Sequence, residues 1–153
     1  MPHTTELLHS QRVGEIVRFL EHTSYSTESV QWLLDWIEVP VRLSQAEFSY
    51  AGEPGRQLMM GLVTWALLDY MRYAQASLVG VRALRRSEWN EGLNIWVNLF
   101  AANRDRVFSF ARLLHRRAAL LRMPVAYKRR KGGRTKVVIA QVGRVEVWHL
   151  DHS

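Results

Sequence analysis

The segment VAYKRRKGGRTKVVIAQVGRVEVWHL, residues 125–150, decides the fold class that the sequence predicts. Its apolar residues recur with a period of two, as in β-strands, whereas the residues before Pro124 follow helical spacing. Gly132-Gly133 is a two-residue hairpin signal, and Val142-Gly143 marks a second, weaker turn. The segment therefore predicts three antiparallel strands, over residues 125–131, 134–141 and 144–150.

The first turn also predicts which residues pair across the strands. A two-residue turn at Gly132-Gly133 fixes the register, and side chains alternate between the two faces of a strand. One face should then have an apolar base and a cationic tip. The expected pairs on this face are Lys131 with Arg134, Arg129 with Lys136, Tyr127 with Val138, Val125 with Ala140, Val147 with Val138, and Val145 with Ala140.

Residues 1–123 are expected to form a helical body that precedes this meander. Together the two parts predict an α+β protein of one domain, 1–153, with about five helices before a small three-stranded antiparallel sheet in residues 124–150. The polar run from His22 to Ser26 should be a connection. The predicted helices run from Thr4 or Thr5 to about His22, over 27–39, over about 54–74 with a possible extension to Leu84, from Ser87 to about Phe100, and over about 103–122, with a short turn at 44–47.

Two of these helices are predicted from their apolar residues. LMMGLVTWALLDYM, residues 58–71, is apolar on all sides but shorter than the roughly 20 residues of a membrane span, so it is expected to be a buried helix. Trp89, Leu93, Trp96 and Phe100 recur at intervals of four, three and four, which is typical of one helix face. Glu88 would lie in the first turn of that helix, where the helix dipole favours carboxylates.

Charge is distributed unevenly along the chain. Residues 1–100 carry 8 Lys and Arg against 11 Asp and Glu, whereas residues 101–153 carry 13 against 3. The resulting net charges of −3 and +10 indicate a polyanionic partner for the C-terminal third. Cysteine is absent, which excludes disulfides and thiolate metal sites. No secretory signal is visible, and we expect a cytoplasmic protein.

The predicted helix from Arg104 to Arg122 adds to this basic region. Its apolar side chains fall on one stripe, and Arg112 and Arg116 lie nearly opposite that stripe, with Arg117 on a flank. Asp105 is its only acidic residue, although a solvated helix normally mixes charges of both signs. A helix followed by a basic hairpin resembles the wing of winged-helix DNA-binding domains, over about 45 residues and in layout alone.

These patterns predict a non-enzymatic protein that holds DNA or RNA by its phosphate backbone. The alternative is an interaction or assembly subunit of a nucleoprotein, phage or mobile-element complex, whose basic end docks on an acidic protein surface. Motifs of nucleotide-binding, hydrolase and zinc-protease sites are absent, and no catalytic residue, metal or cofactor is expected. The predicted nucleic-acid-binding residues are Arg112, Arg116, Arg117, Lys128, Arg129, Arg130, Lys131, Arg134 and Lys136.

Overall fold

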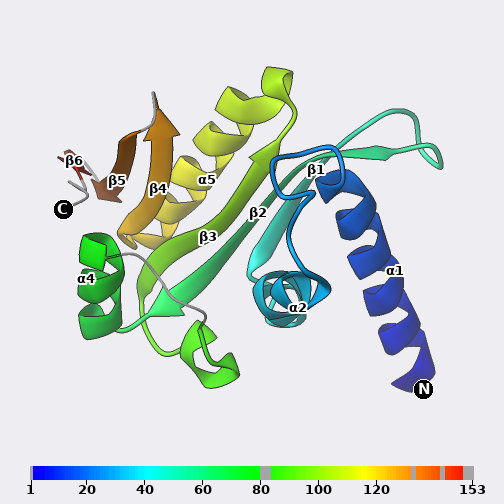
Figure 1. Ribbon diagram of the computed structural model, residues 1–153, viewed down its shortest axis with the longest axis horizontal. Helices are drawn as coiled ribbons and strands as arrows, with labels where there is room; N and C mark the ends of the chain where they lie inside the picture. Colours follow the sequence, from blue (N-terminus) through cyan, green and yellow to red (C-terminus); the bar gives the residue numbers. More distant parts are fainter. Residues whose placement is uncertain (1, 80–83, 132–133, 142–143, 150–153) are drawn as a thin grey trace. The chain divides into compact units, whose positions relative to one another are not determined.

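The structure is a computed structural model that describes the backbone of residues 2–79, 84–131, 134–141 and 144–149 (Figure 1). Among the helices of these ranges, none combines the length and the apolar character needed to cross a bilayer. The helical elements are α1 (Pro2–Leu20), α2 (Val30–Leu33), a π-helix (Leu34–Glu38), α3 (Val39–Arg42), α4 (Tyr70–Val79), a 3-10 turn (Arg86–Trp89), a second 3-10 turn (Arg104–Arg106) and α5 (Val107–Leu121).

The described strands form one mixed sheet, hydrogen-bonded in the order β1-β2-β3-β4-β5-β6. β3 and β4 run parallel, with Ile95–Val97 beside Val125–Tyr127. The pairs β1–β2, β4–β5 and β5–β6 are antiparallel. The strands are β1 (Ala46–Ala51), β2 (Leu58–Leu68), β3 (Asn94–Ala102), β4 (Val125–Lys131), β5 (Arg134–Gln141) and β6 (Arg144–His149).

The predicted arrangement, a helical body over 1–123 followed by a separate three-stranded meander, is therefore wrong. The chain is α+β, but β2 and β3 occupy segments that were expected to be helical, and β1 begins within the turn predicted at 44–47. Strands and helices are therefore interleaved. The meander is one part of a larger sheet. The local layout that resembled the wing of a winged helix, a helix followed by a hairpin, is present in α5, β4 and β5, but this hairpin belongs to a larger mixed sheet.

The helices predicted at β2 and β3 are wrong because a strand covered on both faces has no alternating pattern. Both strands are buried at consecutive positions: Leu62, Val63 and Thr64 in β2, and Ile95, Trp96 and Val97 in β3. A continuous apolar run does not distinguish a buried strand from a buried helix. In β3 the β-branched and aromatic residues Ile95, Trp96, Val97 and Phe100 favour a strand, whereas most of β2 consists of Leu, Met and Ala, which do not.

The loop before β2 also differs from the prediction. Pro54 was expected to begin a helix, but it lies in the connection between β1 and β2. Gly52 and Gly55 in that connection have φ angles of +113° and +85°, which only glycine adopts without strain. The connection therefore reverses the chain, and β1 and β2 pair as antiparallel neighbours with a bulge between Ser49 and Tyr50.

Several other predictions are confirmed. α1 and α5 lie where helices were expected, and 30–42 is helical, although the helix continues past Pro40 instead of ending there. β4 and β5 have the predicted bounds, and β6 ends at His149. The predicted register is confirmed at all six pairs, from Lys131 with Arg134 to Val145 with Ala140. The turns at Gly132-Gly133 and Val142-Gly143 lie outside the described residues.

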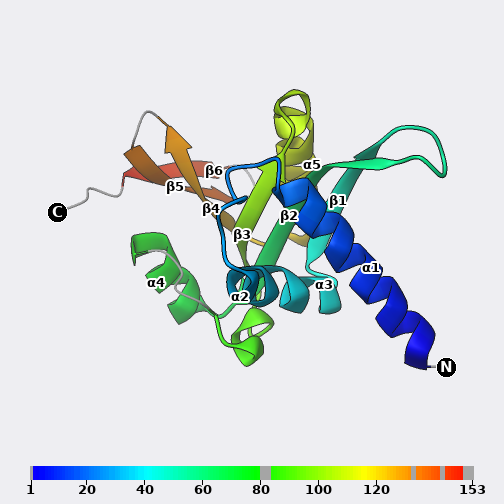
Figure 2. The ribbon, with the colours of Figure 1, turned by 45° about the vertical axis from the view of Figure 1, so that its right-hand side comes forward.

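The contacts divide the chain into two compact units. Unit 1 comprises Met1–Thr64 and Leu99–Phe110. Its core joins α1, the π-helix and the strands. Figure 2 shows α1 beside β1. The Arg12 side chain on α1 donates to the Tyr50 hydroxyl and lies 4.9 Å from the ring centre of Phe48, both in β1. The buried core residues are Ile16, Phe19, Leu20, Ile37, Leu62, Leu99 and Ala101.

Unit 2 comprises Trp65–Asn98 and Ala111–Ser153. Trp89 and Trp96 are buried in it, at 1% and 2% exposure, which confirms that they belong to the core. The base of the hairpin is buried at adjacent positions of both strands, Val125 and Ala126 in β4 and Val137 and Val138 in β5. The sheet is therefore covered on both faces there, not only on the single face that the sequence predicted.

Candidate nucleic-acid interface

The part of α5 that belongs to unit 2 has one buried and one solvent-facing side. Leu114 is buried, whereas Arg112 and Arg116 are exposed, as the apolar stripe of the sequence predicted. The helix ends at Leu121, and Arg122 adopts a φ of 53°, the left-handed conformation that commonly terminates a helix. The two arginines are four residues apart and so project from one side of the helix.

An aromatic contact joins α5 to the first strand of the hairpin. The rings of His115 and Tyr127 lie 5.8 Å apart, centre to centre, in an edge-to-face arrangement. His115 thus faces the sheet, while Arg112 and Arg116 face solvent. Lys128 follows Tyr127 in β4 and is exposed. The contact between His115 and Tyr127 therefore joins two elements of unit 2 that both carry exposed cations.

The hairpin register brings like charges opposite each other. Arg129 pairs with Lys136, and Lys131 pairs with Arg134. Such pairs on neighbouring strands destabilise a sheet by about 0.2–1 kcal/mol each. The backbone of these residues is described, but the side chains of six predicted site residues are not: Arg117, Arg129, Arg130, Lys131, Arg134 and Lys136.

The two units differ in net charge. Unit 2 contains 15 Lys and Arg against 5 Asp and Glu, a net of +10, and unit 1 contains 6 against 9, a net of −3. Among the residues whose side chains the structure describes, the ion pairs are Arg12–Glu15, Arg42–Glu38 and Arg72–Glu88, and none of them involves Arg112, Arg116 or Lys128. Arg112, Arg116 and Lys128 are exposed to solvent.

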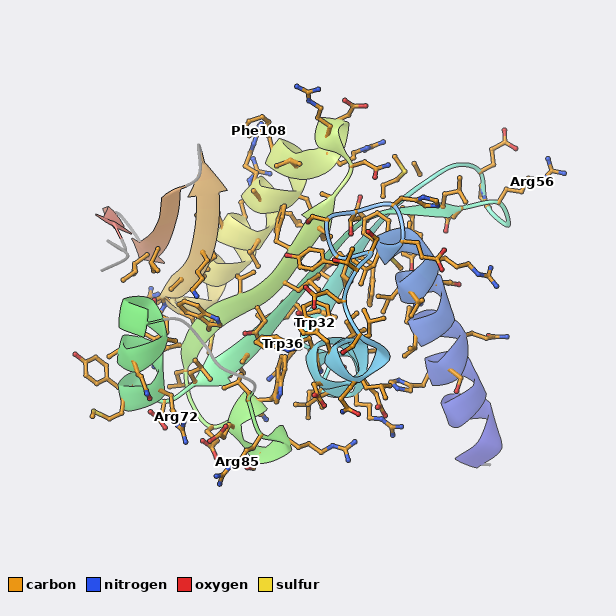
Figure 3. All side chains as sticks on the ribbon, viewed as in Figure 1. Trp32, Trp36, Arg56, Arg72, Arg85 and Phe108 are labelled. Carbon is orange, nitrogen blue, oxygen red and sulfur yellow. The ribbon has the colours of Figure 1, made fainter. Side chains whose placement is uncertain are left out.

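One partly buried ion pair was not predicted from the sequence. Glu88 was expected at the start of a helix, but it is 7% exposed and accepts a hydrogen bond from the Arg72 side chain. Figure 3 shows the side chains of Arg72, on α4, and Arg85, before the 3-10 turn. Its second oxygen accepts from the Arg85 backbone N–H at 2.8 Å. This carboxylate connects α4 to the 3-10 turn before β3. No linear spacing joins residues 72 and 88, so no sequence signal indicated the pair.

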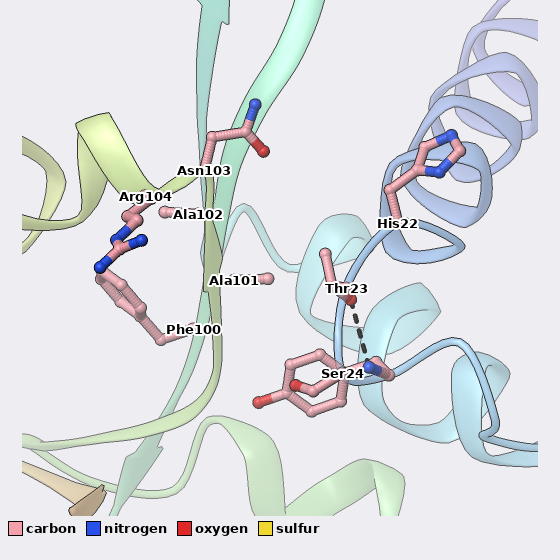
Figure 4. A pocket seen from close by; sticks show the side chains of 9 residues that line it. His22, Thr23, Ser24, Phe100, Ala101, Ala102, Asn103 and Arg104 are labelled. Atoms are coloured by element: carbon pink, nitrogen blue, oxygen red, sulfur yellow. Dashed lines mark hydrogen bonds between the residues drawn. The ribbon is translucent and has the colours of Figure 1, made fainter.

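A pocket of about 320 Å3 in unit 1 was not predicted either. It lies between the connection that follows α1 and the end of β3 (Figure 4). The sequence predicted only a connection at His22–Ser26. The lining residues are His22, Thr23, Ser24, Tyr25, Phe100, Ala101, Ala102, Asn103 and Arg104.

Burial alters the acidity of tyrosines in both units. In unit 1, burial raises the pKa of Tyr25, although a hydrogen bond with the Phe100 backbone opposes the shift. In unit 2, burial raises the pKa of Tyr73 on α4 to about 12. Both hydroxyls therefore stay protonated near neutral pH and can donate hydrogen bonds there.

Comparison with known proteins gives no assignment. No protein-family model matches the chain, and no curated protein matches it.

Proposed function

We propose that this chain is a non-enzymatic protein that binds nucleic acid through the phosphate backbone, using α5 and the β4–β5 hairpin. The observation that carries the proposal is the net +10 of unit 2, together with the exposed Arg112, Arg116 and Lys128, which form no ion pair with any acidic residue whose side chain the structure describes. Clustered cations without internal partners suit a polyanion, because binding releases the counterions condensed on the phosphates.

The two elements would contribute in different ways. Arg112 and Arg116 are one helical turn apart, about 6 Å along the axis, and a guanidinium can hold a phosphate through two parallel hydrogen bonds. The hairpin cations would follow the backbone or enter a groove, as two-stranded ribbons do in DNA. Phosphates beside the pairs Arg129–Lys136 and Lys131–Arg134 would relieve the repulsion between like charges in the register.

Replacement of the hairpin cations tests this proposal. The variant carries Ser at positions 129, 130, 131, 134 and 136, and fluorescence anisotropy measures its binding to labelled duplex DNA, single-stranded DNA and RNA at about 50 and 200 mM salt. We expect weaker binding by a similar factor on unrelated sequences, because interactions with phosphates carry no sequence information. The slope of log K against log salt should fall by about 1 for each phosphate that the substituted side chains neutralise in the wild type.

The matched control replaces Arg18 and Arg42 with Ser. Both lie in helices of unit 1, outside the proposed surface. Affinity and salt slope should remain those of the wild type. If the hairpin variant also kept the wild-type affinity and slope, the hairpin would not be the binding surface, and the proposal would fail.

An interaction subunit that docks on an acidic protein surface is the second candidate. Leu113 is 46% exposed and lies directly beside Arg112, and an exposed apolar side chain among arginines is typical of protein interfaces. Poly-L-glutamate serves as the probe in the same anisotropy experiment, as a competitor of labelled duplex. Absence of nucleic-acid binding near 150 mM salt, with retained binding to labelled poly-L-glutamate, would favour this candidate.

A further inference from the structure

The ring of Phe108 lies on the solvent-exposed side of α5. Phe108 is the second residue of the helix and is 76% exposed, whereas Phe110 is 3% exposed and packs on Phe100 with ring centres 5.6 Å apart. Figure 3 shows the Phe108 side chain directed outward from the first turn of α5. Among the residues whose side chains are described, none forms a ring contact or a cation–π contact with Phe108, so its ring is largely accessible from solvent.

Two arginines continue the exposed side of α5 beyond Phe108. Arg112 and Arg116 follow at intervals of four residues, and both are exposed. Residues four apart on a helix lie on the same side, about 6 Å apart along the axis, and α5 is one continuous helix from Val107 to Leu121. The exposed side of α5 therefore presents an aromatic ring and two guanidinium groups in one row.

The charged side chains of this row are all positive. α5 contains no Asp or Glu, and Asp105 lies in the 3-10 turn before the helix. A single exposed apolar residue is common on protein surfaces and has no meaning by itself. An exposed aromatic ring in line with arginines is a different case, because aromatic side chains within a basic surface are typical of proteins that bind single-stranded nucleic acid.

An unpaired nucleotide carries the groups that complement this row. Its base has a planar face that stacks on an aromatic side chain, and its phosphate accepts hydrogen bonds from a guanidinium. In a duplex, neighbouring bases cover these faces, so an aromatic ring reaches them only after the bases have been unstacked. An acidic protein surface would complement the arginines by charge, but it does not place a planar apolar group beside each negative charge.

We propose that Phe108 stacks on an unpaired base of a single-stranded nucleic acid, while Arg112 and Arg116 bind phosphates of the same strand. This inference rests on the proposed function and narrows its ligand from nucleic acid in general to single strands. The contribution of stacking does not depend on salt, because the Phe108 ring carries no charge and releases no counterion. It adds little sequence preference, because every base has a planar face.

The test compares two single strands of equal length and equal charge, one of which lacks bases. Fluorescence anisotropy at about 150 mM salt measures the binding of labelled oligodeoxythymidine, of an abasic deoxyribose-phosphate strand, of oligouridine and of a duplex. We expect the wild type to bind oligodeoxythymidine about tenfold more tightly than the abasic strand, because the two strands differ only in their bases. The stronger of oligodeoxythymidine and oligouridine identifies DNA or RNA as the preferred strand.

Phe108→Ala should remove the preference for the strand with bases. We expect its affinity for oligodeoxythymidine to fall about tenfold, whereas its affinity for the abasic strand and the duplex and its salt slope remain those of the wild type. Phe108→Trp should keep the preference, because tryptophan also offers an aromatic face. Since Phe108 is 76% exposed, its replacement leaves no cavity in the core, and the urea midpoint should not change.

Tyr70→Ala is the matched control, since Tyr70 is an aromatic residue that is 74% exposed but lies on α4, outside the proposed surface. It should bind all four probes as the wild type does. Equal affinity of the wild type for oligodeoxythymidine and the abasic strand would overturn stacking by Phe108 and leave the proposed function intact. So would an equal loss on duplex and single strands in Phe108→Ala. Absence of binding to every probe would instead overturn the proposed function, and this inference with it.

Discussion

A Cβ atom at position 92 would lie 2.1 Å from the carbonyl oxygen of Leu68 and 2.4 Å from the backbone nitrogen of Asp69. Backbone atoms cannot move aside as a flexible side chain can. We expect Gly92→Ala to destabilise the protein by about 3 kcal/mol or more, because the backbone of β2 or of the loop must shift. Urea unfolding measures the change in the free energy of unfolding.

Gly14→Ala is the control for this substitution. Gly14 lies within α1, and no atom would approach its added Cβ within 4 Å. Alanine lowers the entropy of the unfolded chain and favours helix, so a gain of about 0.5–1 kcal/mol is expected. A neutral Gly92→Ala variant would contradict the close packing of the loop against Leu68.

Ionisation of Tyr73 should lower the stability of the protein at alkaline pH. Burial raises its pKa from 10.0 to about 12, so the folded protein binds this proton more tightly than the unfolded chain does. The contribution of this proton to the free energy of unfolding is fully present below pH 10. It decreases by about 2 kcal/mol as the pH rises from 10 towards 12. Tyr73→Phe should remove this part of the decrease in stability, as measured by urea unfolding at pH 9 and pH 11.

Tyr70→Phe provides the comparison, because Tyr70 lies on the same helix but is 74% exposed. The stability of the Tyr70→Phe variant should decrease between pH 9 and pH 11 by the same amount as that of the wild type. An identical decrease in Tyr73→Phe and the wild type would show that the Tyr73 hydroxyl does not contribute to the alkaline transition.

At the scale of elements, the contact between Arg72 and Glu88 holds α4 to the 3-10 turn. Glu88 also accepts from the Arg85 N–H, and its side chain is 9% exposed. We expect Glu88→Ala to cost about 2 kcal/mol, because it removes the buried carboxylate that accepts hydrogen bonds from the Arg85 N–H and the Arg72 side chain. The Arg72 side chain is 47% exposed, so screening by solvent limits the coupling between the two side chains to about 1 kcal/mol.

A double-mutant cycle with Arg72→Ala and Glu88→Ala measures this coupling by urea unfolding. Glu91→Ala is the control, since Glu91 is exposed and lies three residues further along the chain. It should change stability by less than about 0.5 kcal/mol. Strictly additive effects in the cycle would mean that the two side chains do not interact in solution.

The sequence predicts elements well where one face of the element is polar. α5 has one buried side and one charged side, which predicts where the helix lies. A glycine pair joins β4 and β5, which predicts the bounds of these strands and the register between them. β2 and β3 lack this contrast, because both of their faces are covered. Their identity as strands depends on tertiary burial, which no single segment reveals.

For the molecule as a whole, the sequence indicates where charge lies but not which residues meet. The excess of cations after residue 100 is visible in the chain, and it becomes the net +10 of unit 2. The pocket depends on residues 22–25 and 100–104, which come together only after folding. Neither segment carries a recognised motif, so their proximity could not be inferred from spacing.

The parallel pairing of β3 with β4 also affects how the protein is made. Ile95–Val97 cannot pair with Val125–Tyr127 until α5 and the start of β4 have left the ribosome. During that interval the nascent chain presents an unpaired, apolar strand edge, which promotes association with other chains. Synthesis of about 30 further residues ends this exposure, so we expect the nascent chain to be most prone to association while that stretch is being made.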